Sequence, residues 1–180
     1  YNSQSEVNRE PLDQVIGRAV KQFSFPRQSK QPHRALSDFF HKDRHDVIAL
    51  TCVSAGGKLS DAERLIMDAG EYTEYYQFHG LGVELAEALA EIAHKQVRLD
   101  LNISDGEGSK LSDVRMNKYQ GSRYSFGYAA CPDLELNRPL FDLLKPEEFG
   151  IELSETFQIH PEQSTSALVV YHPNATYYNV

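Results

Sequence analysis

The chain has 180 residues, 41% of them apolar and 24% charged, which is the composition of a globular protein with a sizeable core. A net charge of −8 argues against a nucleic-acid partner, because such proteins concentrate Lys and Arg, and no apolar run approaches the ~20 residues that span a bilayer. Two cysteines are too few for a disulfide framework, so a cytoplasmic location is expected.

The beginning of the chain predicts little regular structure. It starts at Tyr1 rather than Met, which indicates a fragment of a longer protein. Residues 1–14 are polar and without a period, so we expect a loop. The mixture of β-branched and aromatic residues over 15–25 predicts one or two short strands that end before Pro26. Residues 34–40 follow as a short helical turn.

A strand and two helices are predicted next. Residues 46–54 form a continuous apolar run bounded by charges and by glycines, which is typical of a strand buried on both faces. Ser60 and Glu63 have the spacing of a capping box and predict a helix that continues to about Ala69. A long helical pattern covers 71–97, with an interruption or a new start near its two glycines.

The second half of the chain mixes helices with β-rich segments. Residues 111–118 predict a short helix, and 138–150 predict a helix that ends before Pro146. The β-rich segments 165–171 and 176–180 flank a proline turn and predict a C-terminal β-hairpin. Because helices and strands do not alternate, the whole chain is expected to form one α+β domain, with a mixed or antiparallel sheet and long helices.

Part of the long helix has two faces at 100° per residue. The apolar face holds Leu85, Ala86, Leu89, Ala90, Ile92 and Ala93. The opposite polar stripe holds Glu84, Glu87, Glu91 and His94. This stripe is either a solvated surface or a source of carboxylates that balance a ligand cation. A third alternative is a metal site, since Glu91 and His94 have the Glu-x-x-His spacing of di-iron bundles, but the sequence has no second such pair.

The segment RYSFGY, Arg123 to Tyr128, has the chemistry of a binding loop. Arg123 supplies a planar fork that can hold a carboxylate, and Gly127 allows a ligand to approach the backbone. Tyr128 offers a ring face and a hydroxyl. A purely structural loop is the alternative. Cys131 has no His or Cys at metal-ligand spacing, so we expect a packed, inert thiol there, as for Cys52.

With its continuation, this segment reads RYSFGYAACP and resembles the Arg-x-x-x-Gly-Tyr-x-x-Cys-Pro signature of the activation (reactivation) domain of cobalamin-dependent methionine synthase. The likeness extends in order from Phe23 to Val180. The other similar segments are FSFPRQ, ALSDFF, YYQFHGLGVELAEALAEIAH, LFDLLKPEEFGIELSETF, HPEQSTSALVVYHP and TYYNV.

The resemblance implies a module that binds S-adenosylmethionine and supports reductive remethylation (reactivation) of cob(II)alamin during methionine biosynthesis. In that family, cobalamin is bound by a neighbouring domain, on which this module docks. The electron comes from flavodoxin or an equivalent reductase. The whole enzyme is the 5-methyltetrahydrofolate–homocysteine methyltransferase, so no catalytic residue and no metal ligand is expected in this segment.

The resemblance also implies a set of ligand-binding residues. An arginine binds the carboxylate end, the loop that follows it lines the adenosyl group, a tyrosine pair after the His-Pro turn contributes further, and a helix glutamate faces the cations of the ligand. These residues are Glu87, Arg123, Gly127, Tyr128, Ala130, Cys131, Tyr177 and Tyr178.

Three departures from the family pattern accompany the resemblance. Ala129 replaces the usual proline, the binding aspartate of the family is expected upstream of Tyr1, and some relatives continue with helices beyond Tyr178. The alternative function is therefore a non-enzymatic module that docks on the cobalamin domain or a reductase and binds no cosubstrate of its own.

Overall fold

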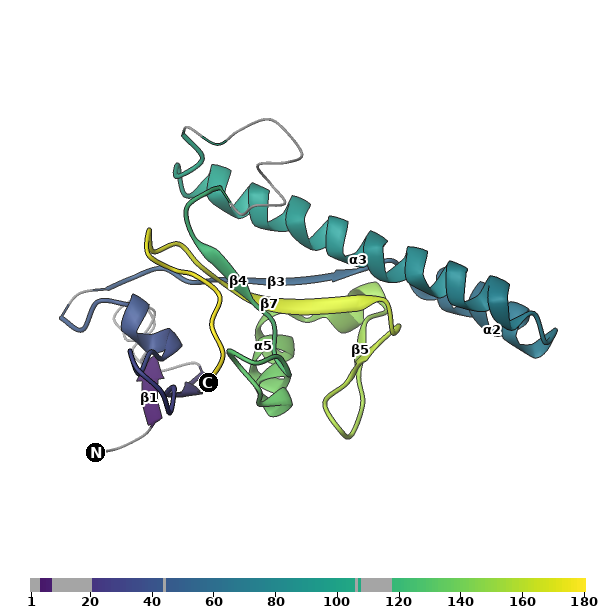
Figure 1. Ribbon diagram of the computed structural model, residues 1–180, viewed down its shortest axis with the longest axis horizontal. Helices are drawn as coiled ribbons and strands as arrows, with labels where there is room; N and C mark the ends of the chain where they lie inside the picture. Colours follow the sequence, from purple (N-terminus) through teal and green to yellow (C-terminus); the bar gives the residue numbers. More distant parts are fainter. Residues whose placement is uncertain (1–3, 8–20, 44, 106, 108–117) are drawn as a thin grey trace.

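The computed structural model describes residues 4–7, 21–43, 45–105, 107 and 118–180 (Figure 1). Within these ranges the elements are, in order, β1 (Gln4–Val7), β2 (Phe23–Pro26), η1 (Leu36–Phe39), β3 (Ala49–Ser54), α2 (Gly57–Asp68), α3 (Tyr72–Asp100), β4 (Ser122–Tyr124), η2 (Leu134–Leu136), α5 (Asn137–Leu144), η3 (Pro146–Phe149), β5 (Glu152–Leu153), β6 (Ile159–His160) and β7 (Ser164–Val170).

The main sheet is built around β7, which pairs antiparallel with β3 on one side and with β4 on the other. Residues 167–170 of β7 are all buried, as expected for a central strand covered on both faces. The predicted C-terminal hairpin is wrong, because 171–180 form no strand. Both edges of β7 are already paired, so a returning strand would have no edge to join.

The two faces of the sheet are covered differently, with α3 along one face and α5 against the other (Figure 1). The face toward α5 carries an aromatic core that combines segments far apart in the sequence. Its fully or nearly buried members are Phe23, Phe25, Leu36, Phe39, Tyr124, Phe126, Ala130, Cys131, Leu136, Leu140, Phe141, Ile151, Leu168, Val170, Ala175 and Tyr178. The C-terminal segment belongs to this core through Ala175 and Tyr178.

Helix α3 meets the rest of the chain through small side chains. Ala86 and Ala90 are buried, as the predicted apolar face requires, but Leu85 and Ile92 are 44% and 66% exposed. His94, predicted for the polar stripe, is instead 1% exposed. The prediction was wrong at Leu85, Ile92 and His94. The buried face of α3 follows a line of residues spaced by four, which are Gly82, Ala86, Ala90, His94 and Arg98.

Helix α2 begins three residues before Ser60, at Gly57, with no side-chain cap. The predicted capping box is wrong, because Ser60 and Glu63 both bind Gln163 instead. Ser60 Oγ donates to Gln163 Oε1 at 3.0 Å, and Gln163 Nε2 donates to Glu63 Oε2 at 2.6 Å. The helix therefore uses its first two turns to hold the segment that enters β7.

Other predicted elements agree or differ in detail. The turn at 34–40 and the helix that stops before Pro146 are confirmed. Of the strands predicted over 15–25, β2 covers the last three residues and extends one residue further, through Pro26, while 15–20 lie outside the described residues. The loop predicted over 1–14 is wrong in part, because β1 pairs with β2 there. The predicted helix over 111–118 falls outside the described residues, except for its last residue.

Two predictions of the central region also need correction. Strand β3 is partly exposed along its whole length rather than buried on both faces, because it is an edge strand of the sheet. Helix α3 is continuous through Gly80 and Gly82, with no interruption. A side chain at Gly82 would meet Leu59 of α2 within 2.5 Å, so this glycine allows the two helices to approach.

Candidate functional site

Arg123 and Glu87, both predicted as ligand residues, lie close together on β4 and α3. Arg123 Nη2 donates to Glu87 Oε2 at 2.8 Å. The Arg123 side chain is 19% exposed and that of Glu87 is 52% exposed. Arg123 Nη1 is buried and has no hydrogen-bond partner among the described residues. An unmade hydrogen bond at a buried donor is costly, but Nη1 is closed off from solvent and Nη2 is paired with Glu87, so a ligand carboxylate would reach this fork only after the neighbouring side chains moved.

The loop after β4 is a tight turn closed by its own backbone. Gly127 N donates to Cys131 O, and Cys131 N donates to Tyr128 O, each at 2.8 Å. Gly127 has φ +84°, and a Cβ at this position would lie 2.7 Å from Leu134 Cδ2. The glycine is thus required by the packing of the chain itself, which the sequence alone did not indicate. The Tyr128 side chain remains 59% exposed.

Ala130 and Cys131 line the interior of the protein rather than its surface. Both are buried in the aromatic core. Burial, with a smaller contribution from the negative charge of Asp133, raises the pKa of Cys131 to about 12. The thiol therefore stays protonated near neutral pH, which agrees with the expected inert cysteine. From these two residues a ligand could meet only backbone groups.

The C-terminal segment brings the tyrosine pair to the same loop. Val180 N donates to Ala129 O at 3.1 Å. The ring of Tyr177 is 51% exposed and stacks on Tyr124, with 6.1 Å between centroids. Tyr178 is 8% exposed, and its hydroxyl is buried without a hydrogen-bond partner among the described residues. Burial, with a smaller contribution from the neighbouring Tyr124, raises the pKa of Tyr178.

The predicted site residues fall into two groups, one on each side of β4. Adjacent residues of a strand face opposite sides, so Arg123 faces α3 while Tyr124 faces the aromatic core. The pair of Arg123 with Glu87 forms one group, and the loop 127–131 with Tyr177 and Tyr178 forms the other. Because β4 is an edge strand, a ligand that spans both groups would pass around this edge of the sheet.

Sequence reasoning missed a polar cluster beside Arg123. Arg98 is 1% exposed, donates from Nε to Glu107 Oε1 at 2.5 Å, and lies 3.8 Å from the ring centroid of Tyr119. Tyr119 Oη donates to Glu91 Oε2 at 3.2 Å. The only sequence signal was the repeat of polar residues at intervals of three and four along α3. The cluster fixes the polar side of the helix against the segment before β4.

His94 lies in this cluster as a neutral side chain. Its ring meets Tyr119 edge-on at 5.1 Å between centroids. Burial, reinforced by the positive charges of Arg98 and Arg123, lowers the pKa of His94 to about 3. Neither ring nitrogen has a hydrogen-bond partner among the described residues. One oxygen of Glu91 accepts from Tyr119, and within the described residues this pair is not part of a group arranged to hold a metal ion.

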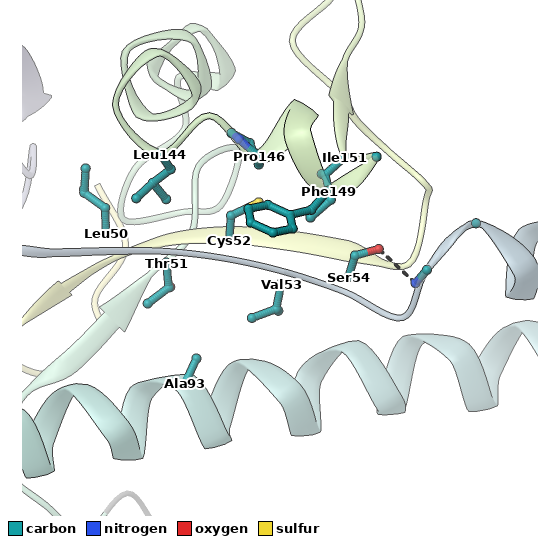
Figure 2. Close-up of a pocket in the computed structure, with 13 residues that line it drawn as sticks. Leu50, Thr51, Cys52, Val53, Ser54, Ala93, Leu144, Pro146, Phe149 and Ile151 are labelled. Atoms are coloured by element: carbon teal, nitrogen blue, oxygen red, sulfur yellow. Dashed lines mark hydrogen bonds between the residues drawn. The ribbon is translucent and has the colours of Figure 1, made fainter.

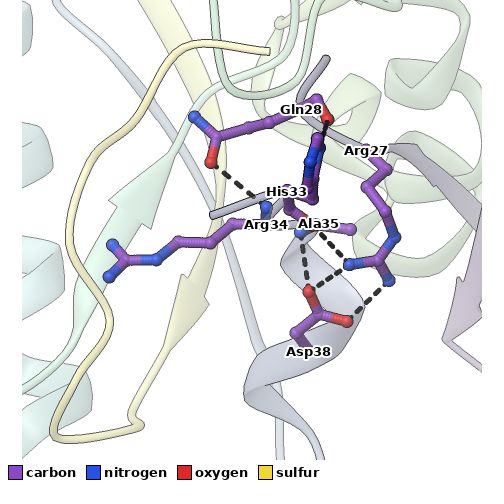
Figure 3. A network of polar contacts seen from close by, with 6 residues as sticks. All are labelled: Arg27, Gln28, His33, Arg34, Ala35 and Asp38. Atoms are coloured by element: carbon purple, nitrogen blue, oxygen red, sulfur yellow. Dashed lines mark hydrogen bonds and ion pairs between the residues drawn. The ribbon is translucent and has the colours of Figure 1, made fainter. Parts of the chain in front are cut away.

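A second network, also missed from the sequence, supports the C-terminal segment (Figure 3). Arg27 donates to both carboxylate oxygens of Asp38, at 2.5 and 2.7 Å. Beside this pair, Arg34 Nη1 donates to Thr176 Oγ1 and Gln28 Nε2 donates to Asn179 O. No periodicity or motif indicated these contacts, because the partners are more than 140 residues apart in the sequence.

A groove of about 500 Å³ lies elsewhere, between β3 and the segment from α5 to Ile151 (Figure 2). Leu50, Cys52 and Phe149 line it. Burial raises the pKa of Cys52 to about 11, so its thiol is protonated near neutral pH. None of the eight predicted ligand residues lines this groove, which belongs to the opposite edge of the sheet.

In the described ranges, no group of three or more His, Cys, Asp or Glu side chains is arranged to hold a metal ion. No helix in those ranges has the length and apolar character needed to cross a membrane.

The chain is similar in sequence to known proteins over most of its length. Two methionine synthases, from Mycobacterium tuberculosis (strain ATCC 25618 / H37Rv) and Mycobacterium leprae (strain TN), are each 37% identical to this chain over 171 residues. Each alignment covers 88% of this chain and 14% of the relative, so the chain spans about one seventh of the length of these curated relatives.

A solved structure described as the MetH reactivation domain bound to AdoHcy has the same fold. The TM-score is 0.86 at 24% identity, and the match covers 99% of this chain and 57% of that chain. This likeness confirms the predicted α+β class. Residues 9–180 also match the family described as vitamin B12 dependent methionine synthase, activation domain, which confirms the resemblance seen in the sequence. The chain therefore belongs to the family of activation domains of vitamin B12-dependent methionine synthases.

Proposed function

We propose that this chain binds S-adenosylmethionine and supports the reductive remethylation of cob(II)alamin within a cobalamin-dependent methionine synthase. The observation that carries this proposal is the solved reactivation domain with AdoHcy, whose fold matches 99% of the chain. AdoHcy is the product that remains when S-adenosylmethionine gives up its methyl group. Family membership over residues 9–180 supports the same role.

The residues on the two sides of β4 suit the chemistry of this ligand. Arg123 Nη1 is a buried donor without a partner in the described part of the chain, and a ligand carboxylate would satisfy it. Glu87 is half exposed beside it and offers negative charge to an ammonium or a sulfonium. The exposed rings of Tyr128 and Tyr177 offer faces for an adenine or a ribose.

The proposed contribution of these residues is to bind and orient the ligand. When bound, S-adenosylmethionine supplies a methyl group that is already activated by the positive sulfur. No side chain of the site needs to move a proton, and the protonated Cys131 is not poised as a nucleophile. Holding the methyl group at a fixed place and angle accounts for the role of the domain.

The cobalamin site and the electron donor needed for reactivation are proposed to lie outside this chain, in other domains of a longer protein and in a partner protein. The relatives are methionine synthases about seven times the length of the matched segment, which supports a single domain at 1–180 working beside others. The proposed partners are the cobalamin-binding domain of the same enzyme, which holds the cobalamin, and flavodoxin or an equivalent reductase. The proposed location is the cytoplasm.

Calorimetric titration of the 180-residue chain with S-adenosylmethionine tests the proposal. We expect saturable binding, and an Arg123→Ala variant with a dissociation constant about 10- to 100-fold higher, because a charge-assisted hydrogen bond contributes roughly 1.5–3 kcal/mol. Arg64→Ala is the matched control, since Arg64 is an exposed arginine on α2 whose ion pair is with Asp61 of the same helix. It should bind as the unmodified chain does.

Two results would overturn parts of this proposal. Equal dissociation constants for the unmodified chain and Arg123→Ala would remove the role of Arg123. Absence of binding by the unmodified chain would favour the alternative, a module that docks on the cobalamin domain and binds no cosubstrate of its own.

A further inference from the structure

The C-terminal segment needs side chains to hold it, because residues 171–180 have no regular secondary structure. Within the described residues, four hydrogen bonds join its second half to other parts of the chain. Tyr124 Oη donates to Thr176 O at 2.9 Å, and Val180 N donates to Ala129 O at 3.1 Å. The other two come from the segment 27–38, which we call the anchoring loop.

The anchoring loop forms hydrogen bonds with the C-terminal segment on both sides of the tyrosine pair. Arg34 Nη1 donates to Thr176 Oγ1 at 3.1 Å, immediately before Tyr177. Gln28 Nε2 donates to Asn179 O at 2.6 Å, immediately after Tyr178. The two contacts therefore bracket the two residues proposed to meet the ligand.

The anchoring loop is itself held in one shape (Figure 3). Arg27 binds Asp38 through two hydrogen bonds and also donates to His33 O at 2.6 Å. The guanidinium of Arg27 lowers the pKa of Asp38, so the carboxylate stays charged in the neutral range. Asp38 Oδ2 in turn accepts from Ala35 N at 2.9 Å. These contacts fix the two ends of the loop relative to one another.

The amide of Gln28 is also fixed in its orientation. Its Oε1 accepts from Arg34 N at 3.1 Å, which leaves Nε2 directed to Asn179 O. Gln28 N donates to Arg34 O at 2.8 Å, so a backbone hydrogen bond fixes these two residues relative to one another. Arg34 is exposed and Gln28 partly exposed, so both contribute little to the core.

We propose that Gln28 and Arg34 are positioning residues for ligand binding, which hold Tyr177 and Tyr178 against the 127–131 loop. The inference rests on the proposed function, because those tyrosines matter to a ligand only if the domain binds one. The two residues act through the C-terminal segment and touch no ligand atom themselves.

The test compares the Gln28→Ala/Arg34→Ala double variant with the unmodified chain. We expect a dissociation constant for S-adenosylmethionine raised about tenfold, together with hydrogen exchange about tenfold faster at the Val180 amide, which donates to Ala129 O. The thermal midpoint should stay within about 2 °C, since few buried contacts are lost. Lys30→Ala is the matched control, because it removes a positive charge from the exposed part of the same loop. It should change none of the three measurements.

A second pair of variants separates positioning from general loosening. In a Tyr177→Ala background, adding Arg34→Ala should weaken binding by much less than it does in the unmodified chain, because the group that it positions is gone. Arg34→Lys should recover part of the affinity, since it retains a donor for Thr176.

The outcomes also separate this inference from the proposed function. If the unmodified chain binds S-adenosylmethionine and the double variant binds it equally well, only this inference is overturned. Unchanged exchange of the Val180 amide would overturn it in the same way. If the unmodified chain does not bind, the proposed function fails and this inference fails with it.

Discussion

His94 is a basic side chain that the folded protein keeps neutral. Its pKa is lowered to about 3 by burial and by the nearby charges of Arg98 and Arg123. In the unfolded chain a histidine titrates near pH 6.5. Between these two values the unfolded state binds a proton that the folded state does not. The stability associated with His94 is therefore complete above pH 6.5 and is lost as the pH falls toward 3.

This difference predicts a measurable slope. Below pH 6.5 the slope of the free energy of unfolding should steepen, approaching about 1.4 kcal/mol per pH unit near pH 5 from this group alone. Urea denaturation across that range, for the unmodified chain and for His94→Gln, provides the measurement. The variant should be less dependent on pH because it cannot bind the proton. Parallel profiles for the two proteins would show that His94 is accessible to protons in the folded state.

Individual residues also show what the sequence could and could not predict about the site. Arg123 and Glu87 were both predicted as ligand residues, but their ion pair joins positions 36 residues apart, which no local pattern indicates. For Gly127 the sequence suggested room for a ligand, whereas the structure places Leu134 on the Cβ side. A motif thus proposes candidate residues, and the packing decides which of their atoms a ligand could reach.

Helix α3 is the element whose packing the sequence predicted least well. The predicted apolar face combined large residues with alanines, but the buried line of the helix is Gly82, Ala86, Ala90, His94 and Arg98, so only its alanines were predicted correctly. Small residues at intervals of four allow β3 and β7 to approach the helix axis closely. Apolar periodicity alone cannot distinguish this from a face of leucines, because it records polarity and not size.

The packing of α3 predicts that a substitution at Ala90 costs more stability than one at Ile92, whereas a buried face formed by the large apolar residues would predict the reverse. Ala90→Leu should lower the free energy of unfolding by about 1–3 kcal/mol, because Ala90 is 2% exposed and a larger side chain would overpack the interface. Ile92→Gln, on the exposed side, should change it by no more than about 0.5 kcal/mol. Chemical denaturation measures both. A larger loss at Ile92 than at Ala90 would mean that the leucine side of the helix is the buried one.

At the scale of the whole molecule, the fold class followed from the sequence while the path of the C-terminus did not. Irregular succession of helices and strands was enough to predict α+β. The hairpin failed because β7 has two partners, from β3 and β4, and pairing between distant segments leaves no trace in local composition. Residues 171–180 instead close the aromatic core and reach the loop at Ala129.

The sheet divides the molecule into two layers of unequal strength. Within the described residues, the aromatic core cluster takes no member from α2 or α3. The helical layer is attached through small residues and through buried polar groups such as His94 and Arg98. Because apolar burial supplies most of the free energy of folding, the helical layer should open more readily than the sheet.

Native-state hydrogen exchange at low denaturant concentrations tests this difference. Amides in the middle of α3 should open with a free energy at least about 2 kcal/mol below that of amides in β7.

Lowering the pH from 7 to 5.5, with intrinsic rates corrected, should reduce protection in α3 more than in β7, because opening the helical layer exposes His94 to a proton. The His94→Gln variant should lose this pH effect while keeping the order of opening. Equal opening free energies for the two elements would show that both layers unfold as one cooperative unit, so that the polar groups beneath α3 hold it as firmly as the aromatic core holds the sheet.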